Sequence, residues 1–239
     1  MRLVLTWMLA VSAAAVAGTD NAPQLPEVGF AGLSVQTAPS QCFGPVSVHF
    51  DPALATPRDD FIELPDHPAG GWRVMLAGRL DRNSQDRYEV RYDDGPSCDP
   101  TFTLWREGDE APLGEFGGDH LVLPGNGFLY VIRRSNRSFE GREKWAVRKG
   151  QLVEVTQSHY YVGVHTHTRK TVKLLQTPAA GAETIAAVPP GERVQIVVQQ
   201  VIDGRDWYLV RTPFGLLGWT EDAAYGEDRQ FEDLQFFGD

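Results

Sequence analysis

Histidine is the residue whose spacing in this sequence most directly suggests chemistry. His159, His165 and His167 lie at odd positions of one short segment. On a β-strand their side chains would share one face with Tyr161. Two histidines two residues apart on a strand can bind Zn²⁺ when a neighbouring strand supplies a third ligand, for which His120 is the candidate. The sequence contains no HExxH motif, and the alternative is a polar, partly solvated face beside a domain boundary. We therefore expect no functional metal.

Paired carboxylates could support acid/base catalysis if a rigid pocket held them together. Most acidic pairs of this sequence lie in apparent turns, where an Asp side chain hydrogen-bonds the local backbone. Examples are Asp59-Asp60, Asp93-Asp94 and Asp109-Glu110. The sequence has no GxSxG motif, and neither cysteine has the histidine arrangement of a catalytic thiol. We expect no catalytic residue and no cofactor, although a hydrolase of unrecognised type at 42–167 stays open as an alternative.

A basic stretch at 133–149 stands out because the chain as a whole is acidic, with a formal net charge of −10. It holds seven basic and two acidic side chains, and its candidate ligand-binding residues are Arg133, Arg134, Arg137 and Arg142. Such a patch could hold a phosphate, an anionic glycan or a lipid headgroup. The alternative is a hairpin edge whose charges prevent aggregation between strands. The overall negative charge argues against nucleic acid as a partner.

Three aromatic residues near the C-terminus are candidates for a stacking surface, namely Trp207, Tyr208 and Trp219. Neighbouring residues of a strand face opposite ways, so we expect at least one of Trp207 and Tyr208 to reach the surface or the seam between the two domains. A flat ring there could stack on a sugar or a peptide. The alternative is that Trp207 and Trp219 close a hydrophobic core.

The elements that would position these residues are short period-two segments broken by turns. Examples are 46–50, 72–80, 88–92, 102–105 and 128–132, and no segment shows a sustained helical stripe. The fold class is therefore all-β, with an antiparallel domain over 42–167 that is a sandwich, an irregular barrel or a partial propeller. Its clearest hairpin spans 143–155 around Lys149-Gly150. The strand at 158–168 ends this domain and leads without a flexible linker into the next.

The stretch at about 168–225 carries short apolar segments bounded by tight turns. In order they include 172–175, Val188-Pro189-Pro190-Gly191, Trp207-Tyr208-Leu209-Val210 and Phe214-Gly215-Leu216-Leu217-Gly218-Trp219. In order and spacing this stretch resembles a bacterial SH3-type (SH3b) domain, and the rest of the chain resembles no family that we recognise. The resemblance implies a small SH3-like β-barrel that binds a peptide or a cell-envelope glycopeptide.

The N-terminal residues 1–17 have the pattern of a secretory signal peptide, with Arg2 followed by an apolar run too short to span a bilayer. No later stretch is long and apolar enough to be a membrane span. We expect cleavage near Ala17, an extended lead-in at 18–41, and a periplasmic or secreted protein. In an oxidising compartment Cys42 and Cys98 should form a disulfide that stabilises the fold by about 4 kcal/mol. Two unpaired thiols are the alternative.

The tail at 226–239 mixes acidic residues with Phe231, Phe236 and Phe237. An exposed Phe ring forgoes roughly 1.5–3 kcal/mol of burial. We therefore expect the tail to fold back, to seat Phe in an apolar groove and to bring its negative charge near 133–149. A disordered end is the alternative.

These patterns together favour an exported, non-catalytic binding protein. Its expected partner is a peptide, a peptidoglycan fragment or another envelope protein. One alternative is a structural or inhibitory protein–protein interaction module of the periplasm, in which the barrel is only a packed support. The hydrolase is the other alternative.

Overall fold

The structure is a computed structural model of the chain, and it describes residues 29–40, 44–64, 67–95, 97–135, 137–222 and 228–234. Within these residues it contains seventeen β-strands and no helix, so the predicted all-β fold is confirmed. Accordingly, no described segment forms a helix that could cross a lipid bilayer. The expected signal peptide and Cys42 lie outside the described residues. Cleavage near Ala17 and the pairing of Cys42 with Cys98 therefore stay predictions.

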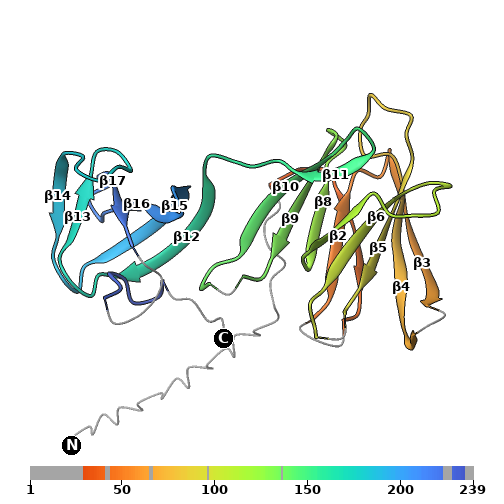
Figure 1. Cartoon of the computed structure of the whole chain (residues 1–239), viewed down its shortest axis with the longest axis horizontal. Helices are drawn as coiled ribbons and strands as arrows, with labels where there is room; N and C mark the ends of the chain where they lie inside the picture. The colour runs from red at the N-terminus through yellow and green to blue at the C-terminus, as the bar shows by residue number, and fades with distance from the viewer. Residues whose placement is uncertain are drawn as a thin grey trace, which may run out of the picture.

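The N-terminal half is a β-sandwich of two sheets (Figure 1). One sheet has the strand order β1-β2-β8-β9-β10-β11 and the other β3-β4-β5-β6-β7. The strands are β1 (Ser34–Ala38), β2 (Val46–Phe50), β3 (Ala55–Leu64), β4 (His67–Gly78), β5 (Tyr88–Asp93), β6 (Thr101–Arg106), β7 (Gly114–Gly117), β8 (His120–Leu123), β9 (Phe128–Arg133), β10 (Gly141–Arg148) and β11 (Gln151–Glu154). Of the three architectures expected for this domain, the chain therefore adopts the sandwich.

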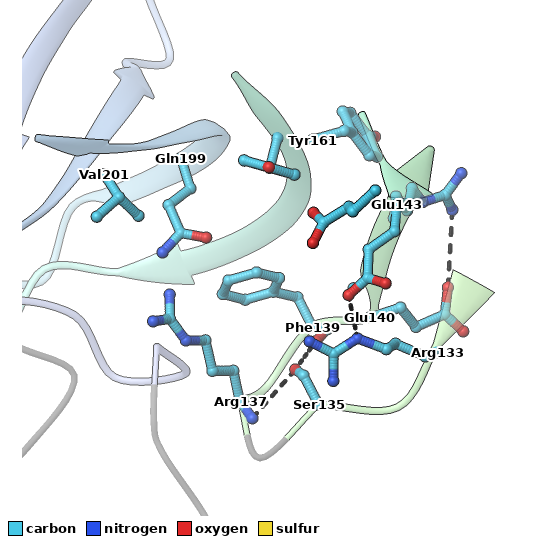
Figure 2. A pocket seen from close by; sticks show the side chains of 13 residues that line it. Arg133, Ser135, Arg137, Phe139, Glu140, Glu143, Tyr161, Gln199 and Val201 are labelled. Carbon is cyan, nitrogen blue, oxygen red and sulfur yellow. Dashed lines mark hydrogen bonds and ion pairs between the residues drawn. The ribbon is translucent and has the colours of Figure 1, made fainter. Parts of the chain in front are cut away.

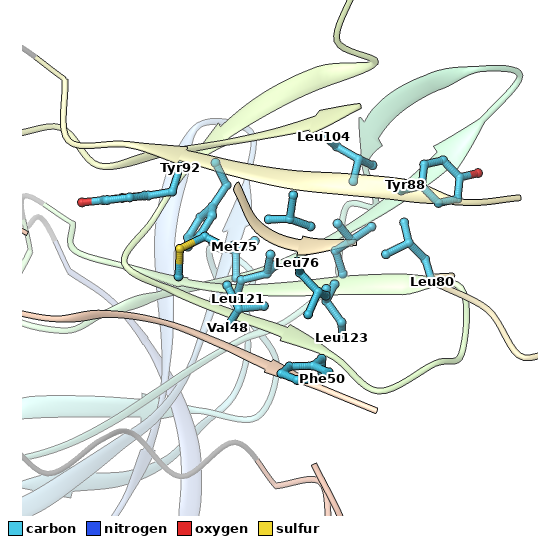
Figure 3. Close-up of a cluster of buried hydrophobic side chains, with 14 of the residues drawn as sticks. Val48, Phe50, Met75, Leu76, Leu80, Tyr88, Tyr92, Leu104, Leu121 and Leu123 are labelled. Atoms are coloured by element: carbon cyan, nitrogen blue, oxygen red, sulfur yellow. The ribbon is translucent and has the colours of Figure 1, made fainter. Parts of the chain in front are cut away.

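Apolar side chains from both sheets form one core between them (Figure 3). Met75 of β4, Phe102 of β6 and Leu121 of β8 are fully buried there. Residues of β5 alternate between buried and half-buried positions, which is the period-two pattern that a strand with one core-facing side requires. In β5 the core-facing residues therefore follow from the alternation, whereas every residue of β2 is buried.

Two features of the sandwich differ from the sequence-based expectation. The first strand is β1, inside the stretch expected to be an extended lead-in, and it pairs with β2. Its alternation is inverted, because Val35 is exposed while Gln36 is half-buried, so hydrophobicity does not reveal it. The second difference is that β2 and β8 pair in parallel, within a domain expected to be antiparallel. The chain builds the whole second sheet between these two strands, and that long crossover allows the parallel pairing.

The C-terminal half is a single six-stranded sheet in the order β12-β15-β16-β17-β13-β14, with every neighbouring pair antiparallel. Its strands are β12 (Tyr160–His167), β13 (Val172–Leu175), β14 (Thr184–Val188), β15 (Arg193–Ile202), β16 (Arg205–Arg211) and β17 (Leu217–Glu221). The sheet is open, since no pairing between its edge strands β12 and β14 closes it within the described residues. The described strands therefore do not form the closed small β-barrel that was expected for this half.

The strand β12 belongs to this C-terminal sheet and not to the N-terminal domain, where the sequence placed it. It pairs with β15 along most of its length. The strand precedes the apolar motifs of the SH3b-like stretch, so local sequence gives no sign of its partner. Its Val162 and Thr166 are buried against the C-terminal half. The N-terminal sandwich accordingly ends with β11.

The described part of the tail, 228–234, folds back onto the C-terminal sheet as expected. Phe231 and Leu234 are fully buried in the same core cluster as Tyr208. The backbone N–H of Glu232 donates to the carbonyl of His167 at 3.0 Å, which fixes the tail beside β12. Phe236 and Phe237 lie outside the described residues, and the expected charge contact with 133–149 stays a prediction.

The hairpin expected around Lys149-Gly150 is present as β10 and β11. Lys149 has a φ of 53° and Gly150 a φ of 76°, which are the two left-handed residues that a tight two-residue hairpin turn needs. Turn chemistry in the sequence therefore located this hairpin correctly.

Candidate functional site

The segment that joins the two halves runs along the edge of β10. The N–H of Val155 donates to the carbonyl of Lys144 at 2.7 Å. The side-chain Nε2 of Gln157 donates to the carbonyl of Arg142 at 3.4 Å. Because these bonds fix the connection to the sandwich, β12 begins at a defined distance from β10. This agrees with the expectation that no flexible linker separates the two halves.

A second contact between the halves comes from the loop after β9. The guanidinium of Arg137 forms a 3.0 Å ion pair with Asp206 and a 3.4 Å hydrogen bond with the hydroxyl oxygen of Tyr208. Phe139 packs against the C-terminal core. Burial raises the pKa of Tyr208, and the nearby Asp206 carboxylate raises it further, so the phenol stays neutral beside Arg137. The loop thus anchors the sandwich to the C-terminal sheet.

Between these two contacts lies a cleft of about 340 Å³ (Figure 2). Its walls come from both halves of the chain: the end of β9 with its following loop, β10 and β11 on one side, and β12 and β15 on the other. The lining residues are Arg133, Ser135, Arg137, Phe139, Glu140, Gly141, Arg142, Glu143, Glu154, Tyr160, Tyr161, Gln199 and Val201. Segments far apart in the sequence therefore build one site.

Three of the four candidate arginines line this cleft, and all four pair with carboxylates. Arg133 forms an ion pair with Glu143, and Arg142 pairs with Glu140 at 3.7 Å. Arg137 pairs with Asp206, as described above. Arg134 does not line the cleft and pairs with Asp119 at 3.4 Å. The four candidate arginines are therefore not unopposed: Glu140 and Glu143 belong to the basic stretch itself, and folding adds Asp119 and Asp206.

Of the three candidate aromatic residues, two are unavailable for stacking. Trp207 is 3% exposed and Tyr208 is fully buried, so neither ring reaches the surface. The reason is that β16 lies in the middle of the sheet and both of its faces are covered at this point. Tyr208 instead reaches the seam between the two halves, the other expected position, where its hydroxyl oxygen lies 3.4 Å from Arg137. Trp219 is half-buried, with the ring of His159 at 6.0 Å between centroids.

The most exposed of the aromatic side chains that line the cleft is that of Tyr161. Tyr161 is 52% exposed, and the guanidinium of Arg142 lies 5.4 Å from the centroid of its ring. Sequence reasoning placed Tyr161 only on a polar face of the histidine strand. The signal that could have found it is the Tyr160-Tyr161 pair at the start of an edge strand, where one ring must point outward.

The histidines do not gather into a metal centre. His159 contacts Trp219, His167 lies 3.6 Å from a carboxylate oxygen of Glu232, and His120 belongs to the sandwich. Among the described residues, no group of three His, Cys, Asp or Glu side chains is placed to hold a metal ion.

His120 instead takes part in a buried polar cluster. Its Nδ1 lies 2.7 Å from Ser47 Oγ, and His49 Nε2 lies 3.4 Å from the same oxygen. A hydroxyl beside an imidazole is the arrangement that nucleophilic catalysis uses. Ser47, however, is fully buried, so a substrate cannot reach its oxygen in this conformation. The cluster contributes to stability within the sandwich.

This cluster should make the stability of the protein depend on pH. Burial lowers the pKa of His49, and the neighbouring His120 lowers it further. The unfolded state, in which histidine has a pKa of about 6.5, then binds a proton more readily than the folded state. The free energy of unfolding should therefore fall as the pH is lowered through about 6.5.

Replacing His49 with glutamine should flatten this dependence, since an amide keeps a polar contact with Ser47 without titrating. Urea unfolding on both sides of about pH 6.5 measures it. An equally steep slope in His49→Gln would contradict the assignment.

Comparison of the chain with protein-family models, with curated proteins and with solved structures found no match. The resemblance of 168–225 to SH3b domains therefore stays a hypothesis. The functional argument below is therefore based on the geometry of the cleft.

Proposed function

We propose that this protein is an exported, non-catalytic binding protein that holds a peptide, or the peptide part of a cell-envelope glycopeptide, in the cleft between its two halves. The observation that carries the proposal is the mixed lining of the cleft. Three arginines and three glutamates surround the exposed ring of Tyr161. A peptide carries both ammonium and carboxylate groups, so it can pair with both kinds of wall residue. A purely anionic ligand would instead face three carboxylates.

The volume of the cleft suits a small ligand. About 340 Å³ lies at the lower end of the range for small-molecule sites, which is roughly 300–1,000 Å³. Phe139 and Val201 add apolar surface to the walls, so a ligand side chain can be buried there. A few linked residues of a peptide fit these dimensions better than a folded domain.

One ion pair of the wall is loose enough to exchange with a ligand. The Arg142–Glu140 pair is 3.7 Å long, and both side chains are more than a third exposed. Such a pair contributes roughly 0–1 kcal/mol, so a ligand carboxylate can replace Glu140 at small cost. Arg142 also holds the ring of Tyr161, which places a charge and a flat stacking surface side by side.

The first test is the variant Tyr161→Ser. Calorimetric titration of the full chain with soluble peptidoglycan fragments that carry stem peptides should show binding, and Tyr161→Ser should weaken it by about tenfold, the loss typical of an interface aromatic. Phe214→Ser is the matched control, because Phe214 is an exposed aromatic outside the cleft. Equal affinities in Tyr161→Ser and the parent chain, or equal binding of glycan strands without peptide, would contradict the proposal.

A second candidate is a structural or inhibitory protein–protein interaction module, and one observation favours it. A row of apolar residues crosses five strands in register and stays partly exposed, as cross-strand neighbours on one face. The row consists of Leu175, Trp219, Leu209, Val198 and Tyr161. A folded partner could cover this surface. Capture of such a partner from a periplasmic lysate, with no binding to peptidoglycan fragments, would favour this candidate.

A further inference from the structure

The turn between β16 and β17 presents apolar side chains to solvent. Phe214 at its tip is 95% exposed, Leu216 is 39% exposed and Leu217 is 48% exposed. Ile185 of β14 is also exposed and lies beside Gly218, the second residue of β17. This tip is separate from the cleft, whose lining includes none of these residues.

Hydrogen bonds hold the turn in this shape. The N–H of Leu216 donates to Oγ1 of Thr212 at 3.1 Å, and the N–H of Thr212 donates to the carbonyl of Leu216 at 3.0 Å. The N–H of Gly215 donates to the carbonyl of Thr212 at 2.9 Å. Gly215 has a φ of 93°, a left-handed conformation that glycine adopts without strain. These bonds fix the turn in a shape that leaves the Phe214 ring in solvent, away from the sheet.

Positive charge flanks the tip. Arg211 is the cross-strand neighbour of Leu217 on one side and of Gln195 on the other, so the three side chains share a face. Arg193 lies two residues before Gln195 and so on that same face. Both arginines are exposed, and neither has an ion-pair partner within the described part of the chain. This local charge is opposite in sign to that of the whole chain.

We propose that this turn docks the protein on an anionic lipid bilayer. Phe214, Leu216 and Leu217 insert at the boundary between headgroups and acyl chains, while Arg193 and Arg211 contact lipid phosphates. A bilayer accepts a small convex apolar tip without a complementary pocket. A stable protein–protein interface, in contrast, buries roughly 1,200–2,000 Å², which is far more than three side chains at one turn supply. The proposal does not depend on the peptide-binding function of the cleft.

The experiment is flotation of the full chain with vesicles of phosphatidylcholine, with and without phosphatidylglycerol. Binding is expected to the anionic vesicles and should weaken as salt is raised, because salt screens the arginine–phosphate attraction. Phe214→Ser should lower the partition coefficient by about tenfold or more, the loss expected for one buried aromatic ring. Arg211→Gln should lower it less and should reduce its salt dependence.

Two control variants separate this surface from other causes. Phe61→Ser removes an aromatic residue that is 55% exposed on the sandwich, and Tyr161→Ser removes the cleft ring. Both should bind vesicles as the parent chain does. Unchanged binding of Phe214→Ser, or equal binding to neutral and anionic vesicles, would overturn the proposal. Self-association of the parent chain that Phe214→Ser abolishes, without vesicle binding, would instead assign the tip to a second copy of the chain.

Discussion

Replacing Phe231 with alanine is expected to lower the free energy of unfolding by about 3–5 kcal/mol. Phe231 is fully buried in the core of the C-terminal sheet, together with Leu234 of the same tail. Its backbone forms a bridge with Thr168, which fixes the position of the ring. Because that bridge prevents the tail from shifting into the vacated space, the substitution leaves a cavity.

The matched control for this prediction is Phe214→Ala, since Phe214 is 95% exposed. It should change the free energy of unfolding by less than about 0.5 kcal/mol. Urea unfolding followed by tryptophan fluorescence compares the two variants under the same conditions. If Phe231→Ala loses no more stability than Phe214→Ala, the tail is not part of the folded core.

Local turn chemistry made part of this fold predictable. Lys149-Gly150 located a hairpin correctly, because a tight turn needs residues that adopt a positive φ and that requirement is satisfied within two positions. The alternation along β5 likewise indicated which residues face the core. The burial of Phe231 followed from a simple energetic argument, since an apolar ring in an acidic tail gains free energy by docking.

Pairing partners were not predictable, because they depend on contacts far along the chain. β12 pairs with β15, and β2 pairs in parallel with β8 across a whole intervening sheet. Period-two alternation shows that a segment is a strand but does not show which neighbour it joins. For the same reason alternation could not decide whether Trp207 and Tyr208 reach the surface or the seam between the halves. The central strand β16 has no exposed face at that point, and Tyr208 meets Arg137 at the seam.

The cleft illustrates the same limit for function. Arg133, Arg137 and Arg142 were singled out as a group because they are close in sequence. The acidic residues that neutralise them include Asp206, which is far away in sequence, and the ring of Tyr161 comes from another sheet. Composition therefore identified the arginines of one wall, whereas the carboxylates that pair with them could be located only from the folded structure.

Glycine 218 provides the second prediction with a large expected effect. A Cβ built on Gly218 would lie 2.7 Å from Leu174 Cβ and 3.1 Å from Ile185 Cδ1. The first distance is shorter than real carbon contacts allow, and Leu174 is fully buried in the core. Gly218→Asp would add a carboxylate in this apolar space, so both overpacking and desolvation of charge oppose it. We expect a loss of about 4–5 kcal/mol in the free energy of unfolding.

The same substitution at Gly181 separates these effects from the loss of glycine itself. A Cβ at Gly181 meets no atom within 4 Å, and its φ of 80° is the only source of strain there. Gly181→Asp should therefore cost only about 1–2 kcal/mol, the penalty of a left-handed backbone for a residue with a side chain. Gly218→Ala, which adds the Cβ without the charge, should fall between the two aspartate variants. Urea unfolding of all three gives the comparison, and equal losses in Gly218→Asp and Gly181→Asp would mean that β17 does not pack against β13 and β14 as the structure has it.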